Sequence, residues 1–375
     1  MRKIPLCIPA TGDEEIRAVS EILASGWLAH GPKNHEFEEM FARYIGVRHA
    51  ITMNSCTSAL HLAIEALELT GEVIVPSFTW VASVNSIILG GAIPVMVDID
   101  VDTRNISIAA VERAISPRTQ AIMVVHYGGL PADMPRIIEL AKRRNLRVIE
   151  DSAECLGGTY CGGTQAGAYD IGCFSFFPTK NITTGEGGMF TTNDDDLARK
   201  IRALSAHGID SSTYQRELEQ TPWLRKASRP GYNFRMSNIL AAIGVEQMRK
   251  LELFNGARRQ IAERYIARLS GCSFVHFQSV PTGFVSAWQM FTILVPADIR
   301  NELVHSLRNI GIGASVHFDP PVHTQPPYTD IKRGSSLANT EDVSSRLVTL
   351  PIYPTMAMED VDYVAEAILA YFART

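Results

Sequence analysis

The chain is organised around the segment Asp170-Ile171-Gly172-Cys173-Phe174-Ser175-Phe176-Phe177-Pro178-Thr179-Lys180-Asn181. Four of its residues, Cys173, Phe174, Phe176 and Phe177, are apolar and predict a short buried strand, and Pro178 ends the regular ladder. Lys180 follows that break, and the glycine-rich turn 183–188 lets backbone come close to a bound group. Desolvation lowers the pKa of a lysine and frees its amine as a nucleophile, so Lys180 is a candidate Schiff-base residue. A solvated loop position is the commoner explanation for an arbitrary lysine.

The bulk composition is that of an ordinary soluble globular protein. The chain has 375 residues, of which 46% are hydrophobic and 20% charged, and its net charge is −5. This length predicts two domains, which we place at residues 1–250 and 251–375. No run rich in lysine and arginine is present, which argues against nucleic acid and membrane surfaces as partners.

Three features of the sequence indicate a cytoplasmic protein. Residues 13–15 are acidic and precede any apolar run, which argues against a secretory signal. The uncharged stretch 73–97 contains Pro76, Pro94 and two glycines, so it predicts a strand, a helix and a strand rather than a membrane span. The six cysteines show no Cys-x-x-Cys and no zinc spacing, which is typical of reduced, buried thiols.

From Ala50 onward, short apolar runs alternate with amphipathic ones. We expect strands at 50–54, 72–76, 93–97, 121–126, 146–150 and 189–192, and helices at 57–69, 80–89, 108–115, 134–144 and 194–207. Continuously apolar strands joined by helices predict a parallel sheet that is covered on both faces, an α/β doubly wound fold. Ligands of such sheets bind at the carboxyl ends of the strands.

The chain changes character after this repeating part. The segment 209–236 is long and polar and shows no clear hydrophobic period. Such a segment is usually functional or reaches a partner. Residues 237–269 are strongly helical. Beyond them we expect a smaller α+β domain with strands at 287–295 and 315–318 and helices at 300–310 and 360–371.

Two acidic residues follow the predicted strand 146–150. Asp151 stands at its carboxyl end, where it can form a charge-assisted bond to a protonated ring nitrogen. Pyridoxal phosphate (PLP) needs such a partner because its electron sink works best when that nitrogen is protonated. A loop or helix-capping aspartate explains this residue alone equally well. Glu154 faces the same group or is a surface carboxylate.

Hydroxyl groups gather between a predicted strand and the helix after it, in Asn54-Ser55-Cys56-Thr57-Ser58. Hydroxyls and free N–H groups at a helix N-terminus suit a phosphate, although serine and threonine are also ordinary N-caps. Ser175, five residues before Lys180, adds another hydroxyl. Trp80 can stack on a flat ring or belong to the core.

Other candidate sites are weaker. His317 and His323 flank Asp319, but the prolines between them and the lack of a third ligand argue against a metal. His61 is expected to pack within a helix. The sequence has no P-loop and no Gly-x-Gly-x-x-Gly at a helix start, which argues against an NTPase or a nicotinamide enzyme.

Together these motifs resemble the DegT/StrS-type sugar aminotransferases, PLP enzymes of the aspartate-aminotransferase fold (fold type I). The resemblance runs over nearly the whole chain and is most specific at residues 170–188. The other matching segments are 54–60, 76–82, 94–100, 131–134, 150–153, 232–236, 311–318 and 350–354.

The resemblance implies a role for each candidate residue. Lys180 would form the Schiff base and move protons, and Asp151 would pair with the ring nitrogen; both would be catalytic. Trp80 would stack on the ring. The other cofactor contacts would come from Ser55, Cys56, Thr57, Ser58, Glu154 and Ser175. Substrate contacts would come from Glu186, Tyr232 and His317.

Three further residues refine this expectation. Asn233 resembles the residue that family members direct to the phosphate of the neighbouring subunit, which implies a homodimer with shared active sites. Glu154 stands where many members have glutamine and is similar to the branch that includes perosamine synthases. Related dehydratases carry histidine at the position of Lys180, so the lysine favours transamination.

The implied reaction moves an amino group from an amino acid, with glutamate expected, to a keto-deoxysugar nucleotide, most simply a 4-keto-6-deoxy sugar. The product would be an aminosugar for polysaccharide or glycoconjugate synthesis. Two alternatives stay open. One is an aminotransferase of the same fold that acts on a non-nucleotide ring ketone such as a cyclitol. The other is a non-enzymatic PLP-binding regulator.

Overall fold

A computed structural model describes residues 2–210, 223 and 226–374. Its centre is a seven-stranded sheet in the order β1-β9-β8-β5-β4-β2-β3. Only β9 runs antiparallel to its neighbours β1 and β8, and the remaining pairs are parallel. The strands are β1 (His49–Met53), β2 (Glu72–Pro76), β3 (Ile93–Val97), β4 (Thr119–Val125), β5 (Arg147–Asp151), β8 (Ile171–Ser175) and β9 (Gly188–Thr192).

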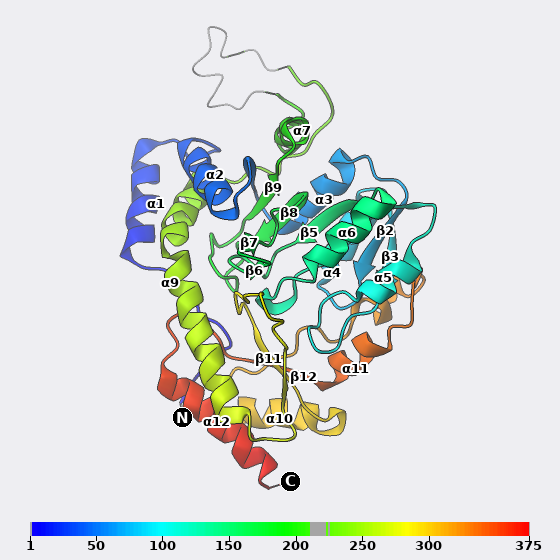
Figure 1. Cartoon of the computed structure of the whole chain (residues 1–375). Helices are drawn as coiled ribbons and strands as arrows, with labels where there is room; N and C mark the ends of the chain where they lie inside the picture. The colour runs from blue at the N-terminus through cyan, green and yellow to red at the C-terminus, as the bar shows by residue number, and fades with distance from the viewer. Residues whose placement is uncertain (1, 211–222, 224–225, 375) are drawn as a thin grey trace.

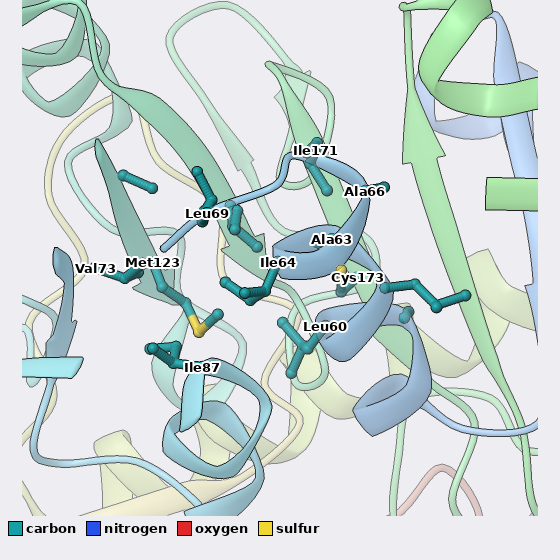
Figure 2. Packing of buried hydrophobic residues seen from close by; sticks show 14 of the residues in the cluster. Leu60, Ala63, Ile64, Ala66, Leu69, Val73, Ile87, Met123, Ile171 and Cys173 are labelled. Carbon is teal, nitrogen blue, oxygen red and sulfur yellow. The ribbon is translucent and has the colours of Figure 1, made fainter. Parts of the chain in front are cut away.

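Helices cover both faces of this sheet, because its strands are apolar on both sides. Val73 and Val75 join one core with α3 (Cys56–Ala66), α4 (Val81–Leu89) and α7 (Asp195–Ser205). Figure 2 shows Leu60 and Ile64 of α3 packed in this core near Met123 of β4. The residue between the two valines, Ile74, joins the opposite core with α5 (Ile108–Ala114) and α6 (Met134–Arg144). The predicted α/β doubly wound fold is confirmed.

A helical layer lies at the β1 edge of the sheet. The 32-residue helix α9 (Asn238–Leu269) packs against α1 (Asp13–Ser25) and α2 (Pro32–Ile45) and then continues to the C-terminal part (Figure 1). In the described part of the chain neither α9 nor any other helix is long and apolar enough to cross a membrane.

The C-terminal part contains a three-stranded antiparallel sheet, β10 (His276–Phe277), β11 (Phe291–Leu294) and β12 (Leu347–Leu350). Its own core is closed by α10 (Ala297–Asn309), α12 (Met358–Phe372) and the second half of α9. Ile4 belongs to this core, so both termini lie at this end of the molecule (Figure 1). The predicted strand 315–318 is reduced to one bridge, Ser315 to Thr349.

The expected strand 287–295 is shorter in the structure because its first residues make contacts outside the three-stranded sheet. Ala287 N donates to Gly129 O, and Trp288 has a positive φ of 45°. Regular pairing therefore begins only at Phe291. The division into 1–250 and 251–375 stays a proposal, and its boundary falls within the unbroken helix α9.

Short elements complete the fold. A small hairpin of β6 (Thr159–Tyr160) and β7 (Thr164–Gln165) follows β5. The segment before α11 (Ala338–Arg346) returns to the large sheet, where Met96 N donates to Lys332 O and Gly334 N donates to Met96 O. Single 3-10 turns lie at Tyr127–Gly129, Val322–Thr324 and Pro326–Tyr328.

Candidate active site

The carboxyl ends of the parallel strands open onto a cavity of about 410 Å³. Ligands of parallel sheets bind at this edge. The large sheet and its loops supply Ser55, Cys56, Thr57, Thr79, Trp80, Val125, Asp151, Glu154, Ser175, Lys180 and Glu186 to the cavity wall. The opposite wall is formed by Leu6, Cys7, Gln289, Met290, His317, Phe318, Thr349, Leu350 and Ile352.

Asp151 is the last residue of β5 and is only 6% exposed. Ser83 Oγ donates to its Oδ2 at 2.7 Å, and Ala153 N donates to its Oδ1 at 3.2 Å. Burial raises the pKa of Asp151 more than these hydrogen bonds lower it. Among the described residues no lysine, arginine or histidine forms an ion pair with this carboxylate. The site therefore contains a buried acid that is suited to a cationic ligand group.

The Lys180 side chain reaches the same cavity from the loop after β8. Its Nζ lies 3.5 Å from Oε1 of Glu154, and the other oxygen of Glu154 accepts from Gly128 N at 2.9 Å. The lysine side chain is 16% exposed, so its amine is accessible from the cavity while its stem is packed. The carboxylate of Glu154 thus lies next to the amine in the cavity lining.

Residues on both sides of Lys180 are fixed by distant parts of the chain. The Gln289 amide donates to Thr179 O at 2.9 Å, and Asn181 Nδ2 donates to Asn255 Oδ1 at 2.8 Å. Asn181 Nδ2 also donates to the carbonyl oxygen of Ala287 at 2.9 Å. The position of the lysine loop is therefore set by α9 and by the C-terminal part together.

The hydroxyl-rich loop forms the N-terminus of α3. Ser55 is the N-cap and accepts from Ser58 N at 3.1 Å, while Thr57 is exposed at the cavity. Ser58 is buried, and its hydroxyl bonds to Ser55 Oγ and to Asn54 Oδ1, so it supports the loop rather than lining the cavity. Free N–H groups and hydroxyls at a helix N-terminus form a binding place for an anion.

A glycine allows strand β9 to begin directly behind this loop. A Cβ on Gly188 would lie 2.5 Å from Cys56 N, a distance that real Cβ atoms do not show. Glycine is therefore required there for the close approach of two backbones. Ser175, at the end of β8, pairs with Gly188 across the sheet and adds its side chain to the same wall.

An aromatic ring and a histidine, Trp80 and His317, also line the cavity. Trp80 is 62% exposed, so it is not a core residue, and its ring lies 6.1 Å from that of Phe318. His317 Nδ1 lies 3.1 Å from Thr349 Oγ1, and burial lowers the pKa of His317. The histidine is therefore neutral near pH 7 and can both donate and accept a hydrogen bond.

Two predicted site residues, Tyr232 and Asn233, do not line this cavity. Tyr232 stacks on Phe234 at 4.7 Å and packs edge-on against His61. Asn233 is exposed and accepts from Arg235 Nε at 3.0 Å. The long polar segment that precedes them is described only in part, because residues 211–222 and 224–225 lie outside the described residues.

Apart from His317, the wall opposite the large sheet was missed by the sequence reasoning. Cys7, Gln289 and Thr349 are far from Lys180 in sequence, and no spacing connects them to it. Gln289 did carry one signal, because it is the amide side chain within the apolar run 287–295. It is 5% exposed, and its Oε1 has no hydrogen-bond partner in the part of the chain that the structure describes.

The histidine pair considered as a metal site is held apart by other bonds. His323 Nδ1 lies 2.7 Å from Ser77 Oγ, and its Nε2 lies 3.1 Å from Glu341 Oε1. Within the described ranges, no group of three or more His, Cys, Asp and Glu side chains is placed to hold a metal ion.

The residues around the cavity fit PLP. The cavity combines an accessible amine, a buried carboxylate, an anion-binding helix N-terminus and a large exposed aromatic ring, from Lys180, Asp151, the Ser55 loop and Trp80. These are the groups that a phosphorylated pyridinium aldehyde requires. No single member of the set is specific, but their convergence in one cavity is.

Comparison with known proteins gives the same result. A model of the DegT/DnrJ/EryC1/StrS aminotransferase family matches residues 9–369. The aminotransferase TlmJ from Streptoalloteichus hindustanus is 31% identical, with 100% of both chains covered and a TM-score of 0.92. PseC from Helicobacter pylori, an aminotransferase involved in the biosynthesis of pseudoaminic acid, is 27% identical over 100% of both chains, with a TM-score of 0.93.

A third relative shows the cofactor. Spr1654 from Streptococcus pneumoniae, described as a sugar aminotransferase, has structures in its pyridoxamine-phosphate and PLP forms. Both are 29% identical to this chain and cover 97% of it; they are covered over 98% and 97% of their own length, with TM-scores of 0.90 and 0.89. The chain belongs to the DegT/DnrJ/EryC1/StrS aminotransferase family and is a PLP-dependent aminotransferase.

Proposed function

We propose that this enzyme transfers an amino group from glutamate to the keto group of a sugar nucleotide, a 4-keto-6-deoxy sugar. The observation that carries the proposal is the Lys180 amine, which opens onto a cavity with Asp151 at its base and polar side chains on its walls. It is supported by the descriptions of PseC, an aminotransferase involved in the biosynthesis of pseudoaminic acid, and of Spr1654, a sugar aminotransferase. The product would be an aminosugar for polysaccharide or glycoconjugate synthesis.

The cofactor would be held by residues on three sides. Asp151 would keep the ring nitrogen protonated, and Trp80 would lie against one face of the ring. Ser55, Cys56, Thr57 and Ser175 would bind the phosphate at the start of α3, with Ser58 supporting the loop from behind. When bound, PLP supplies the electron sink that stabilises negative charge on the carbon that gains or loses the amino group.

Lys180 would act first as the covalent anchor and then as the proton carrier. Once the amino donor has displaced it, its Nζ can take a proton from the donor carbon and later return one to the sugar carbon. Glu154, 3.5 Å from Nζ, would keep the released amine within reach of those carbons. Thr179 and Asn181 hold the loop on both sides of the lysine, so side-chain rotation would carry the amine between those carbons.

The substrate would lie between polar groups at the cavity mouth. Glu186 and His317 line it, and the neutral histidine suits a sugar hydroxyl because it can donate or accept. Phe177 and Phe318 add apolar surface that excludes water from the reacting carbon. Tyr232 would join these residues from the partner subunit.

We propose that the active enzyme is a homodimer in which Asn233 completes the phosphate site of the partner. Within its own chain Asn233 is exposed and lies outside the cavity, although Arg235 fixes its side chain. A two-fold interface would place both copies in the same way, so each subunit completes the site of the other. A cytoplasmic location is also our proposal, supported by the six free cysteines.

Subunit mixing tests the shared site. We expect that inactive Lys180→Ala and impaired Asn233→Ala proteins recover activity when their subunits exchange, because one site of each heterodimer is then intact. The matched control mixes Lys180→Ala with Asp151→Asn. Both of these residues lie in the same cavity of one chain, so neither heterodimer site is intact and no recovery is expected. A fully active monomer by light scattering would contradict the proposal.

A substrate panel tests the reaction itself. Purified enzyme is incubated with glutamate and a set of keto-sugar nucleotides or keto-cyclitols, and aminated products are identified by mass spectrometry. We expect amination of a 4-keto-6-deoxysugar nucleotide and none with Lys180→Ala. Amination of a free cyclitol ketone alone would replace the nucleotide sugar by the alternative substrate class.

A further inference from the structure

Two buried hydroxyls form a chain that ends at Asp151. Ser83 Oγ lies 2.7 Å from Asp151 Oδ2, and Thr79 Oγ1 lies 2.8 Å from Ser83 Oγ. Ser83 is fully buried and Thr79 is 2% exposed. The roles given above to Lys180, Asp151 and the phosphate loop leave both residues without a function.

The direction of these hydrogen bonds follows from the charge of the carboxylate. An ionised Asp151 has no proton to give, so the single hydroxyl hydrogen of Ser83 must point at it. Ser83 Oγ can then only accept from Thr79, whose hydroxyl donates. Successive hydrogen bonds of one direction polarise each other, so Thr79 strengthens the bond that Ser83 makes.

The fold places this chain beside the ring-binding side chain. Thr79 and Trp80 are adjacent in the connection from β2 to α4, and Trp80 is the N-cap of the helix that carries Ser83. Ser83 N donates to Trp80 O at 3.2 Å, so the first turn of α4 orients the hydroxyl. One short segment therefore carries both the aromatic ring of the cavity and the support of its buried acid.

The second oxygen of Asp151 is held from two other elements. Ala153 N donates to Oδ1 at 3.2 Å, and the Cys56 thiol lies 3.9 Å from it. Burial raises the pKa of Cys56 well above its usual value, so the thiol is neutral and adds no charge. Burial has the largest effect on the pKa of Asp151 and raises it. Among the groups that lower this pKa, the Ser83 hydroxyl has the largest effect, ahead of Ala153 N and Lys180.

We propose that Ser83, supported by Thr79, is a positioning residue that keeps Asp151 ionised and aimed at the ring nitrogen of the cofactor. The proposal rests on the proposed role of Asp151. Without the hydroxyl, the pKa of the buried carboxyl would rise further, and its preference for a protonated pyridine would weaken. The residue would then matter for recognition of the ring nitrogen and not for the phosphate or the lysine.

The test compares PLP with its 1-deaza analogue, in which carbon replaces the ring nitrogen. Each is titrated into apoenzyme, and the dissociation constants are measured by absorbance and by tryptophan fluorescence. We expect wild type to prefer PLP. Ser83→Ala should lower that preference about tenfold, because a hydrogen bond to a charged group is lost, while its affinity for the deaza analogue stays unchanged.

Two sets of variants control for packing. Ser86 lies on the same helix, is equally buried, and donates to Ser83 O rather than to Asp151. Ser86→Ala should leave the preference for PLP unchanged. Thr79→Val removes the second hydroxyl at nearly constant volume and should reduce the preference by less than Ser83→Ala does, whereas Thr79→Ser should restore it.

Each outcome is decisive. Equal weakening of both ligands in Ser83→Ala, or an unchanged preference, would overturn the proposal and leave Ser83 a packing residue. If Ser83→Ala does not fold, the pair Thr79→Val and Thr79→Ser decides, since a loss with valine alone supports the hydroxyl chain and equal values overturn it. A wild type without preference would instead overturn the role of Asp151, and this inference with it.

Discussion

Two buried carboxylates in this protein have opposite properties. Glu38 of α2 and Asp151 of β5 are 4% and 6% exposed, so burial opposes the charge of both. Glu38 forms an ion pair with Arg202 at 2.8 Å and accepts from Thr52 N at 2.8 Å. Burial raises the pKa of Glu38, but Arg202, His30 and Thr52 more than reverse this and lower it to about 2. The pKa of Asp151 stays raised.

The difference between the two lies in the source of the cation. Glu38 has a guanidinium partner within its own chain, so the fold completes its interactions and the pair stabilises the protein. Asp151 has hydroxyl, amide and thiol neighbours but no such partner among the described residues. A buried acid with a raised pKa beside a reactive amine is typical of a functional site, since its missing cation is supplied by a ligand.

The largest expected effect comes from neutralising the acid in the cavity. Asp151→Asn keeps the shape of the side chain but removes the charge that, by our proposal, would hold the ring proton. We expect turnover to fall on the order of 10²-fold or more, because the electron sink of the cofactor weakens. The measurement is single-turnover amino transfer at saturating cofactor, so that weaker binding does not contribute.

The outcome that contradicts this prediction is simple to observe. Near-normal turnover in Asp151→Asn, with cofactor bound, would show that this acid has a structural role, as Glu38 does. Glu38→Gln is the matched control, because it also neutralises one buried carboxylate. Glu38 is not in the cavity wall, so its turnover should remain that of wild type.

The second expected effect is on stability, and it reverses the order of the two residues. Glu38→Gln should lower the free energy of unfolding by about 2 kcal/mol, because Arg202 loses its partner while Thr52 N keeps an acceptor. Arg202 is 40% exposed, so solvent screens part of the loss. Urea unfolding at neutral pH measures it. Glu36→Gln on the same helix, where the carboxylate is more exposed, should lower the free energy of unfolding by less. An equal decrease for both variants would show that burial does not set the size of the effect.

The large sheet was predictable from sequence because each of its central strands carries its own signal. Runs such as Val73-Ile74-Val75 are apolar at every position, which only a sheet covered on both faces requires. The segments β2, β3 and α6 begin and end where the spacing predicts. The N-terminal helices α1 and α2 were not predicted, since their apolar positions are few and their packing partner α9 is about 200 residues away.

The part of the candidate site that follows the strands of the large sheet was predictable from the sequence, whereas on the other wall only His317 was expected. Asp151, Ser175 and the Ser55 loop stand at carboxyl ends, so the fold class alone brings them together. The wall with Gln289 and Thr349 depends on how the C-terminal part folds back, which no local pattern encodes. Asp151 and Glu38 differ in their partners, which are Ser83 for Asp151 and Arg202 for Glu38. Each partner is far from its carboxylate in sequence, so no local pattern predicts the contact.

The last and smallest expected effect is the pH dependence of these stabilities, and for Glu38 its sign follows from the lowered pKa. The ordinary pKa of this glutamate is 4.5, and the fold lowers it to about 2. Its contribution is therefore complete above pH 4.5 and is lost as the pH falls from 4.5 toward 2. The difference in unfolding free energy between wild type and Glu38→Gln should narrow over that range.

For Asp151 the sign is opposite. Its folded pKa lies above the ordinary value of 3.8, so the native apoprotein binds more protons than the unfolded chain between those two values, and stability falls as the pH rises through them. The ionised carboxylate therefore destabilises the apoenzyme near pH 7, and Asp151→Asn apoenzyme should be slightly more stable than wild type. That gain should vanish in acid below pH 3.8. It should also reverse when PLP is added, because the cofactor supplies the cation that only the wild-type carboxylate can bind.

Urea unfolding with and without PLP measures both changes. An Asp151→Asn apoprotein that is less stable at neutral pH, as expected for Glu38→Gln, would show that the fold already satisfies this acid and that the two carboxylates do not differ as argued.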